Sequence, residues 1–191
     1  LREAVGDETE LALDCGQGNV VNALRFADAV EKYRLAWLED MLDMEGLATV
    51  TPLIKTPTLT GEGYQTFRGF WPLFEKKAIR IVAPDLAYCG GLLEGKKVVE
   101  MAAMHSMLTA VHNICTPLGT MAAVHACSTM PNLIALEFHM VAVPWWQDLV
   151  KSEKPVIKNG YIAVPEKPGT GVELDEEQVR KHLKEGETYF E

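Results

Sequence analysis

Residues 79–105, IRIVAPDLAYCGGLLEGKKVVEMAAMH, form the clearest strand–helix unit of the chain. Its first part, residues 79–85, is rich in β-branched side chains, as is typical of a buried strand, and Pro84 stops it. The glycine pair at 90–91 permits a tight turn. Residues 92–105 then carry apolar side chains at helical spacing. The stretch therefore predicts a strand, a turn and a helix in succession.

The same alternation recurs along the chain. Strands are predicted at residues 11–14, 35–39, 58–62, 79–85, 108–112 and 133–138, and helices at 20–33, 46–55, 67–77, 92–105 and 117–130. Pro52 disturbs the helix at 46–55. Strands that alternate with helices of this length pair in parallel through right-handed crossovers. The sequence therefore predicts an α/β fold with a parallel sheet.

Each apolar run ends with one acidic residue or histidine, and these residues recur at intervals of 23 to 27. They are Asp14, Glu39, Glu62, Asp85, His112 and Glu137. In a parallel barrel the C-terminal ends of all strands lie on one face. The spacing therefore predicts that the six side chains gather at one mouth and form an active site.

Composition narrows the classes of function. The chain has 191 residues, fewer than the roughly 250 of a complete α/β barrel, and is 48% hydrophobic, enough for a sizeable core. Its 18 basic and 27 acidic residues give a formal charge of −9, and no basic run is present, so nucleic acid is not an expected partner. The charged first residues and the absence of a run of about 20 apolar residues predict no targeting segment and no membrane span.

The cysteines point to a reducing compartment. Cys15, Cys89, Cys115 and Cys127 form no CxxC pair and show no metal-ligand spacing. We therefore expect reduced thiols in a cytoplasmic protein.

Eight motifs resemble one family in order and spacing. They are ALDCGQGN, WLED, LTGEG, IVAPDLAYCGG, AVHN, PLGTMAAVH, NLIALEFH and GTGVELDEE. Together they resemble the barrel domain of the enolase superfamily, in its mandelate racemase/muconate lactonizing enzyme-like and acid-sugar dehydratase branch. The resemblance covers nearly the whole chain.

The resemblance implies part of a TIM-like (β/α)7β barrel, in which the predicted strands are the third to the eighth. Residues 1–144 would hold these βα units, and residues 145–191 a C-terminal closing segment and helix, within one domain. A capping domain and the first two strands precede this region in the family, so the chain is expected to be truncated at its N-terminus. Two open sheet edges would then favour pairing with another chain, and we expect a homo-oligomer.

The first three strand-end residues are all carboxylates. Asp14, Glu39 and Glu62 would repel one another on neighbouring strands unless a hard divalent cation neutralised them. Oxygen-only ligation favours Mg²⁺. The ion would stabilise the enediolate that forms when a carboxylic acid loses its α-proton.

The next strand-end residues suggest an acid–base group. Asp85 and His112 end adjacent strands, so the carboxylate can hydrogen-bond the imidazole and make His112 a general base. A histidine or lysine base beside Mg²⁺ is a known pattern of the enolase superfamily. Glu137 is placed to donate a hydrogen bond to the substrate carboxylate if its pKa is raised. The resemblance implies the same role.

Other polar residues leave alternatives open. A single acid at a strand end is more often a helix cap or a loop ion pair than a ligand, and only the ordered set favours the metal site. His139 shares a strand face with Glu137 and fits substrate binding and structural hydrogen bonding equally well. His105 and His125 are expected to be structural and His182 solvated. Trp145 and Trp146 fit either a ligand pocket or a subunit contact.

Three positions depart from the family pattern. Met41 and Gly63 replace a proline and an asparagine that often follow the second and third ligands, and Gly16 stands where some dehydratases carry a second histidine.

The leading hypothesis is Mg²⁺-dependent dehydration of a sugar acid, an aldonate, to a 2-keto-3-deoxy acid by a lyase. A racemase or epimerase of a 2-hydroxy acid and an inactive metal-binding barrel fragment are the alternatives.

Overall fold

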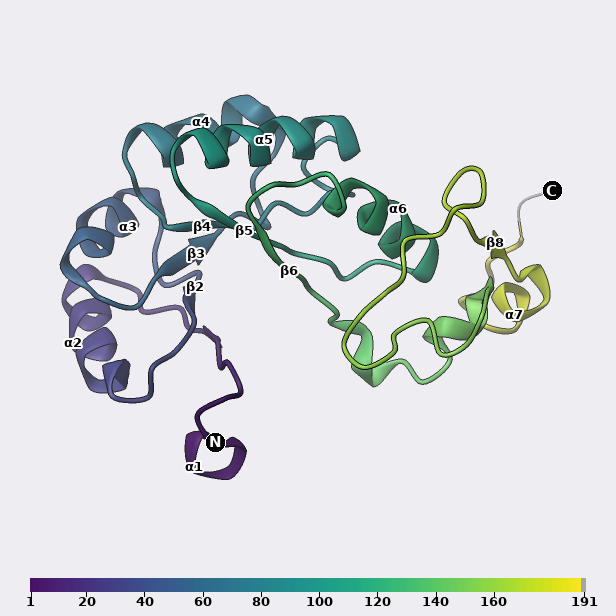
Figure 1. The fold of residues 1–191 in the computed structure, drawn as a ribbon, viewed down its shortest axis with the longest axis horizontal. Helices are drawn as coiled ribbons and strands as arrows, with labels where there is room; N and C mark the ends of the chain where they lie inside the picture. Colours follow the sequence, from purple (N-terminus) through teal and green to yellow (C-terminus); the bar gives the residue numbers. More distant parts are fainter. Residues whose placement is uncertain (190–191) are drawn as a thin grey trace. The chain divides into compact units, whose positions relative to one another are not determined.

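The computed structural model describes residues 1–189, and Figure 1 shows its elements. The chain divides into two compact units. The first contains Leu1–His112 and Pro131–Ala135, and the second contains Asn113–Met130 and the chain from Leu136 on. The division at residue 144 within one domain, expected from the sequence, stays a prediction.

A parallel sheet of six strands in chain order organises the first unit, although the last residue of its sixth strand belongs to the second. The strands are β1 (Leu13–Asp14), β2 (Leu38–Glu39), β3 (Thr58–Thr60), β4 (Ile81–Val82), β5 (Leu108–Val111) and β6 (Leu133–Leu136). All six predicted strands are present, which confirms the parallel α/β fold. They are shorter than predicted; β4 stops before Pro84, which has no N–H to continue the ladder.

Helices follow the strands of the first unit and lie along one face of its sheet (Figure 1). They are α2 (Val20–Glu31), α3 (Met44–Val50), α4 (Thr66–Glu75) and α5 (Leu92–Met104), and the short α1 (Arg2–Val5) precedes β1. The apolar side of α4 is fully buried through Phe70, Leu73 and Phe74. Burial of these large apolar side chains stabilises the unit.

The helix that Pro52 was expected to disturb is short. α3 begins after Asp43, whose Oδ1 accepts the N–H of Gly46 at 2.8 Å and caps the helix. It ends at Val50 and continues as the 3-10 turn η1 (Thr51–Leu53), which contains Pro52. The cap at Asp43 was not predicted, although an aspartate three residues before the first buried positions is a typical start signal.

The guanidinium of Arg80 binds three backbone carbonyls in and just after η1. Its Nη1 donates to Lys55 O at 3.1 Å, and its Nη2 donates to Thr51 O at 3.0 Å and to Ile54 O at 3.1 Å. Because a cation satisfies carbonyls at a helix C-terminus, Arg80→Ala should lower the free energy of unfolding by about 2 kcal/mol. Chemical denaturation measures this loss. Arg68→Ala, at an exposed position of α4, is the matched control, and an equal effect of both variants would contradict the role of Arg80.

The second unit contains α6 (Pro117–Cys127), the 3-10 turns η2 (Met140–Ala142) and η3 (Trp146–Leu149), and α7 (Glu176–Lys181). Its strands β7 (Val150–Lys151) and β8 (Glu173–Leu174) pair antiparallel. Trp146 is 3% exposed, donates its indole N–H to Cys115 O at 2.9 Å and packs edge-on against Phe138. Among residues 1–189, no helix is long and apolar enough to cross a bilayer.

The cysteines of residues 1–189 form no disulfide, and burial raises the pKa of Cys127 to about 12. Only the thiolate is alkylated, so the reaction of native Cys127 with iodoacetamide should speed up with pH until that pKa is reached. Near neutral pH it should be about 10³ times slower than in the chain unfolded by guanidinium chloride. Mass spectrometry of the alkylated peptides measures both rates. Equal rates in the native and unfolded chains would contradict the burial of this thiol.

Candidate active site

Two of the predicted metal ligands stand at paired positions of neighbouring strands. Asp14 is the last residue of β1 and Glu39 is the last residue of β2, and their Cα atoms are partners in the ladder. Neighbouring strands lie about 4.8 Å apart, so side chains at paired positions leave the sheet next to each other. The parallel register therefore brings these two carboxylates to one edge of the sheet.

Trp37 holds the carboxylate of Glu39. Its Nε1–H donates to Glu39 Oε2 at 2.9 Å, and its ring packs against the buried cluster that contains Leu59 and Ile81. Residues two apart on a strand share one face, which is why the indole reaches the carboxylate. Trp37 was not predicted as a site residue, although its i, i+2 spacing from Glu39 is a signal in the sequence.

Glu62 lies two residues beyond β3 and is positioned by a glycine. Gly61 has φ +152°, and a Cβ at this position would lie 2.8 Å from the carbonyl carbon and oxygen of Ala83. Only glycine permits this close approach of the backbone to the segment after β4. The approach carries Glu62 past the end of its strand with its side chain 46% exposed.

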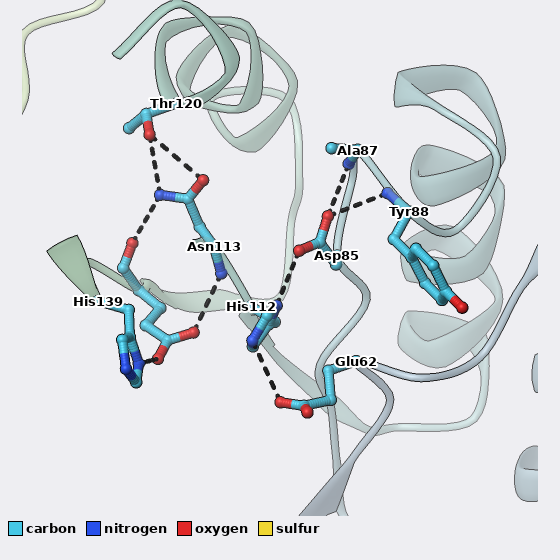
Figure 2. Close-up of polar contacts among 9 residues, drawn as sticks. Glu62, Asp85, Ala87, Tyr88, His112, Asn113, Thr120 and His139 are labelled. Carbon is cyan, nitrogen blue, oxygen red and sulfur yellow. Dashed lines mark hydrogen bonds and ion pairs between the residues drawn. The ribbon is translucent and has the colours of Figure 1, made fainter. Parts of the chain in front are cut away.

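Figure 2 shows the imidazole of His112 between two carboxylates of the first unit. Nδ1 lies 2.8 Å from Asp85 Oδ2, and Nε2 lies 3.2 Å from Glu62 Oε2. The side chains of His112 and Asp85 are 12% and 7% exposed. The structure thus contains the contact between Asp85 and His112 that the sequence predicts.

Two backbone amides fix the orientation of Asp85. The N–H groups of Ala87 and Tyr88 donate to Asp85 Oδ1 at 2.8 and 3.0 Å (Figure 2). Oδ2 is therefore the oxygen that faces the imidazole. Because a carboxylate only accepts hydrogen bonds, the Asp85 contact places a proton on His112 Nδ1, so Nε2, which faces Glu62 Oε2, is the nitrogen that can exchange a proton with a substrate that takes the place of Glu62.

Glu137 belongs to the second unit, just after β6. His139 Nδ1 lies 3.2 Å from Glu137 Oε1, and the backbone N–H of Asn113 donates to Glu137 Oε2 at 3.0 Å. The side chain of Glu137 is 37% exposed and that of His139 is 69% exposed. Glu137 and His139 both follow the end of β6, outside the strand on which they were predicted to share a face, and His139 contacts Glu137 directly.

The remaining histidines have structural surroundings. His105 caps α5 and stacks on Phe74 with ring centroids 5.8 Å apart. His125 Nε2 lies 3.3 Å from Thr170 O. His182 was expected to be solvated, but it stacks face to face on Trp145 at 3.8 Å while remaining exposed. That contact was missed because its two partners lie far apart in the sequence.

The three predicted metal ligands match a magnesium ion in their chemistry but not in their spacing. Asp14, Glu39 and Glu62 offer only carboxylate oxygens, the ligands that Mg²⁺ prefers, so their chemistry fits the ion. Within residues 1–189, however, no three acidic, histidine or cysteine side chains stand close enough together to hold a metal. Glu39 and Glu62 instead contact Trp37 and His112. The magnesium site therefore stays a prediction.

Residues 1–178 match the family described as enolase C-terminal domain-like, and the chain belongs to this family. It is 40% identical to the D-xylonate dehydratase of Haloferax volcanii over 193 residues, which cover 99% of the chain and 47% of that enzyme. It is 32% identical to the L-rhamnonate dehydratase of Saccharopolyspora erythraea, over 93% of the chain and 47% of that enzyme. The predicted resemblance to the acid-sugar dehydratase branch is thereby confirmed.

A solved structure confirms the fold. The chain superimposes with a TM-score of 0.95 on a mandelate racemase/muconate lactonizing enzyme-like protein from Rubrobacter xylanophilus DSM 9941. The two are 40% identical, and the match covers 100% of the chain and 50% of that protein. The chain thus spans about half the length of the relatives it matches.

Proposed function

We propose that the protein dehydrates a sugar acid, an aldonate, to a 2-keto-3-deoxy acid in a magnesium-dependent lyase reaction. The observation that carries this proposal is the imidazole of His112, which Asp85 holds through Nδ1 so that Nε2 is the nitrogen available to take up the α-proton once the substrate replaces Glu62 beside it. The similarity to two acid-sugar dehydratases supports the class of substrate. Removal of an α-proton from a carboxylate needs a base of this kind near neutral pH.

A single side chain, His112, can carry out both proton transfers of the elimination. His112 Nε2 takes the proton from C2 of the aldonate, and the electron pair of the C–H bond moves into the carboxylate to give an enediolate. The pair then returns to form the C2–C3 double bond while the C3–O bond breaks. The imidazolium gives its proton to the departing hydroxyl, which leaves as water. The resulting enol tautomerises to the 2-keto-3-deoxy acid.

The other strand-end residues would handle negative charge. Asp14, Glu39 and Glu62 would hold the magnesium ion, whose positive charge favours loss of the α-proton. Glu137 in its protonated form would donate a hydrogen bond to the substrate carboxylate. Since Glu62 Oε2 lies 3.2 Å from His112 Nε2, the substrate α-hydrogen would take the place of this carboxylate beside the imidazole.

The test is incubation with Mg²⁺ and a panel of aldonates in heavy water. The panel contains D-xylonate, D-gluconate, D-galactonate and L-rhamnonate, and NMR and a keto-acid assay follow the products. We expect a 2-keto-3-deoxy acid with deuterium at C3. Chelation by EDTA should remove the activity, and added Mg²⁺ should restore it.

The other outcomes separate the alternatives. Deuterium exchange at C2 without keto acid would replace the dehydratase by a racemase or epimerase. Neither exchange nor keto acid from any aldonate would overturn the enzymatic proposal in favour of a metal-binding fragment without turnover.

A further inference from the structure

We propose that Asn113 is the positioning residue of Glu137, and that it holds this carboxyl group in the orientation in which it meets the substrate carboxylate. The inference deepens the proposed function and rests on it, because that function gives Glu137 its role. Both residues belong to the second unit.

Asn113 bonds Glu137 at two points. Its backbone N–H donates to Glu137 Oε2 at 3.0 Å. Its side-chain Nδ2 donates to the backbone carbonyl of Glu137 at 3.0 Å. One bond holds the main chain of Glu137 and the other holds the carboxyl group, so together they restrict both the position and the rotation of this side chain.

Asn113 is itself held on a helix. It is 2% exposed, and Thr120 of α6, which is 1% exposed, forms two contacts with its amide. Asn113 Nδ2 lies 3.1 Å from Thr120 Oγ1, and the Thr120 hydroxyl donates to Asn113 Oδ1 at 3.3 Å (Figure 2). Because both residues are buried, water does not compete for these bonds, and the orientation of the amide is set by the protein.

The chemistry at this position requires an amide. The Glu137 carbonyl needs a donor and the Thr120 hydroxyl needs an acceptor, and an asparagine side chain supplies both. An aspartate of the same shape has no donor when ionised and would place a negative oxygen against the Glu137 carbonyl. His139 also contacts Glu137, but from an exposed position, whereas Asn113 contacts it from a buried one.

The chain offers a matched control in the first unit. Asn132 Nδ2 donates to the Met107 carbonyl at 2.8 Å and to Thr109 Oγ1 at 3.0 Å, which is again one carbonyl and one threonine hydroxyl. Asn132→Asp therefore removes the same kinds of bonds as Asn113→Asp at a place that carries none of the candidate catalytic residues.

Two measurements test the proposal. With an aldonate that the native protein dehydrates, Asn113→Asp should lower kcat about 10²-fold with KM nearly unchanged, because Glu137 would be displaced where charge develops. Asn132→Asp should leave both constants near their native values. Thr120→Val, which keeps Asn113 but removes the hydroxyl that orients it, is a milder second variant and should lower kcat less.

The second measurement does not need activity. The NMR signal of the Asn113 backbone amide proton should differ between the native protein and Glu137→Gln, because the variant replaces a charge-assisted hydrogen bond by a neutral one. In Asn113→Asp that amide should exchange faster with solvent than in Asn132→Asp.

The outcomes distinguish the two proposals. Two results would overturn the role of Asn113. One is an Asn113 amide proton whose chemical shift is the same in Glu137→Gln as in the native protein. The other is a native kcat in both Asn113→Asp and Thr120→Val. If the amide responds as expected while the native protein forms no keto acid, the proposed dehydration fails and the link between Asn113 and Glu137 stands.

Discussion

Replacing His112 by asparagine should lower kcat for dehydration of the aldonate by about 10³-fold, because general acid–base catalysis contributes effects of this size. In the proposed reaction one imidazole both removes the α-proton and returns a proton to the leaving hydroxyl. Asparagine keeps a polar group beside Asp85 but has no nitrogen that takes up a proton near neutral pH. Steady-state kinetics with keto-acid detection measures the loss.

The control for this variant is His125→Asn. His125 contacts the carbonyl of Thr170 in the second unit and has no part in the proposed reaction, so its kcat should stay close to that of the native protein. Deuterium exchange at C2 should fall together with dehydration in His112→Asn. If exchange persisted at the native rate, another group would be the base.

Asp85→Asn should lower kcat by about 10²- to 10⁴-fold with little loss of stability, through the tautomer of His112. The N–H groups of Ala87 and Tyr88 both point at Oδ1, so the carbonyl oxygen of an asparagine must stay there and its NH₂ must face the imidazole. A donor at that place requires Nδ1 to accept and puts the ring proton on Nε2. The basic nitrogen would then point away from the substrate.

The tautomer itself is measurable. With an aldonate in place of Glu62 beside Nε2, nitrogen NMR of His112 should report a proton on Nδ1 in the native protein and on Nε2 in Asp85→Asn. Asp43→Asn is the matched control, because asparagine caps a helix about as well as aspartate and this residue lies at the start of α3. If Asp85→Asn moved the ring proton to Nε2 but kept the native kcat, the tautomer of His112 would not control catalysis.

The fold was largely predictable because its signals are local. Apolar runs and helical spacing within each 23- to 27-residue unit give the order of elements, and the parallel sheet follows from their alternation. The ends of the strands were less predictable. The hydrogen bonds between two neighbouring strands stop where their backbones diverge, and this point need not be where a run of apolar residues ends. Residue 79 thus belongs to the predicted strand but lies outside β4.

The candidate site was predictable where the strand register decides it. Asp14 and Glu39 are paired across the ladder, and the side chain of Asp85 reaches His112. Asn113 was missed because its partner Glu137 lies 24 residues further on, and no spacing rule links a buried amide to the main chain of another segment. The contact of Glu62 with the imidazole also depends on side-chain rotation, which periodicity does not report.

The hydrogen bond from Trp37 to Glu39 gives the protein a built-in optical probe. The emission of an indole is sensitive to the charge that its N–H faces, so fluorescence from this ring would follow whatever happens at the neighbouring carboxylate. The chain has four tryptophans, so a variant that keeps Trp37 and replaces the other three would report ion binding without a dye and without substrate.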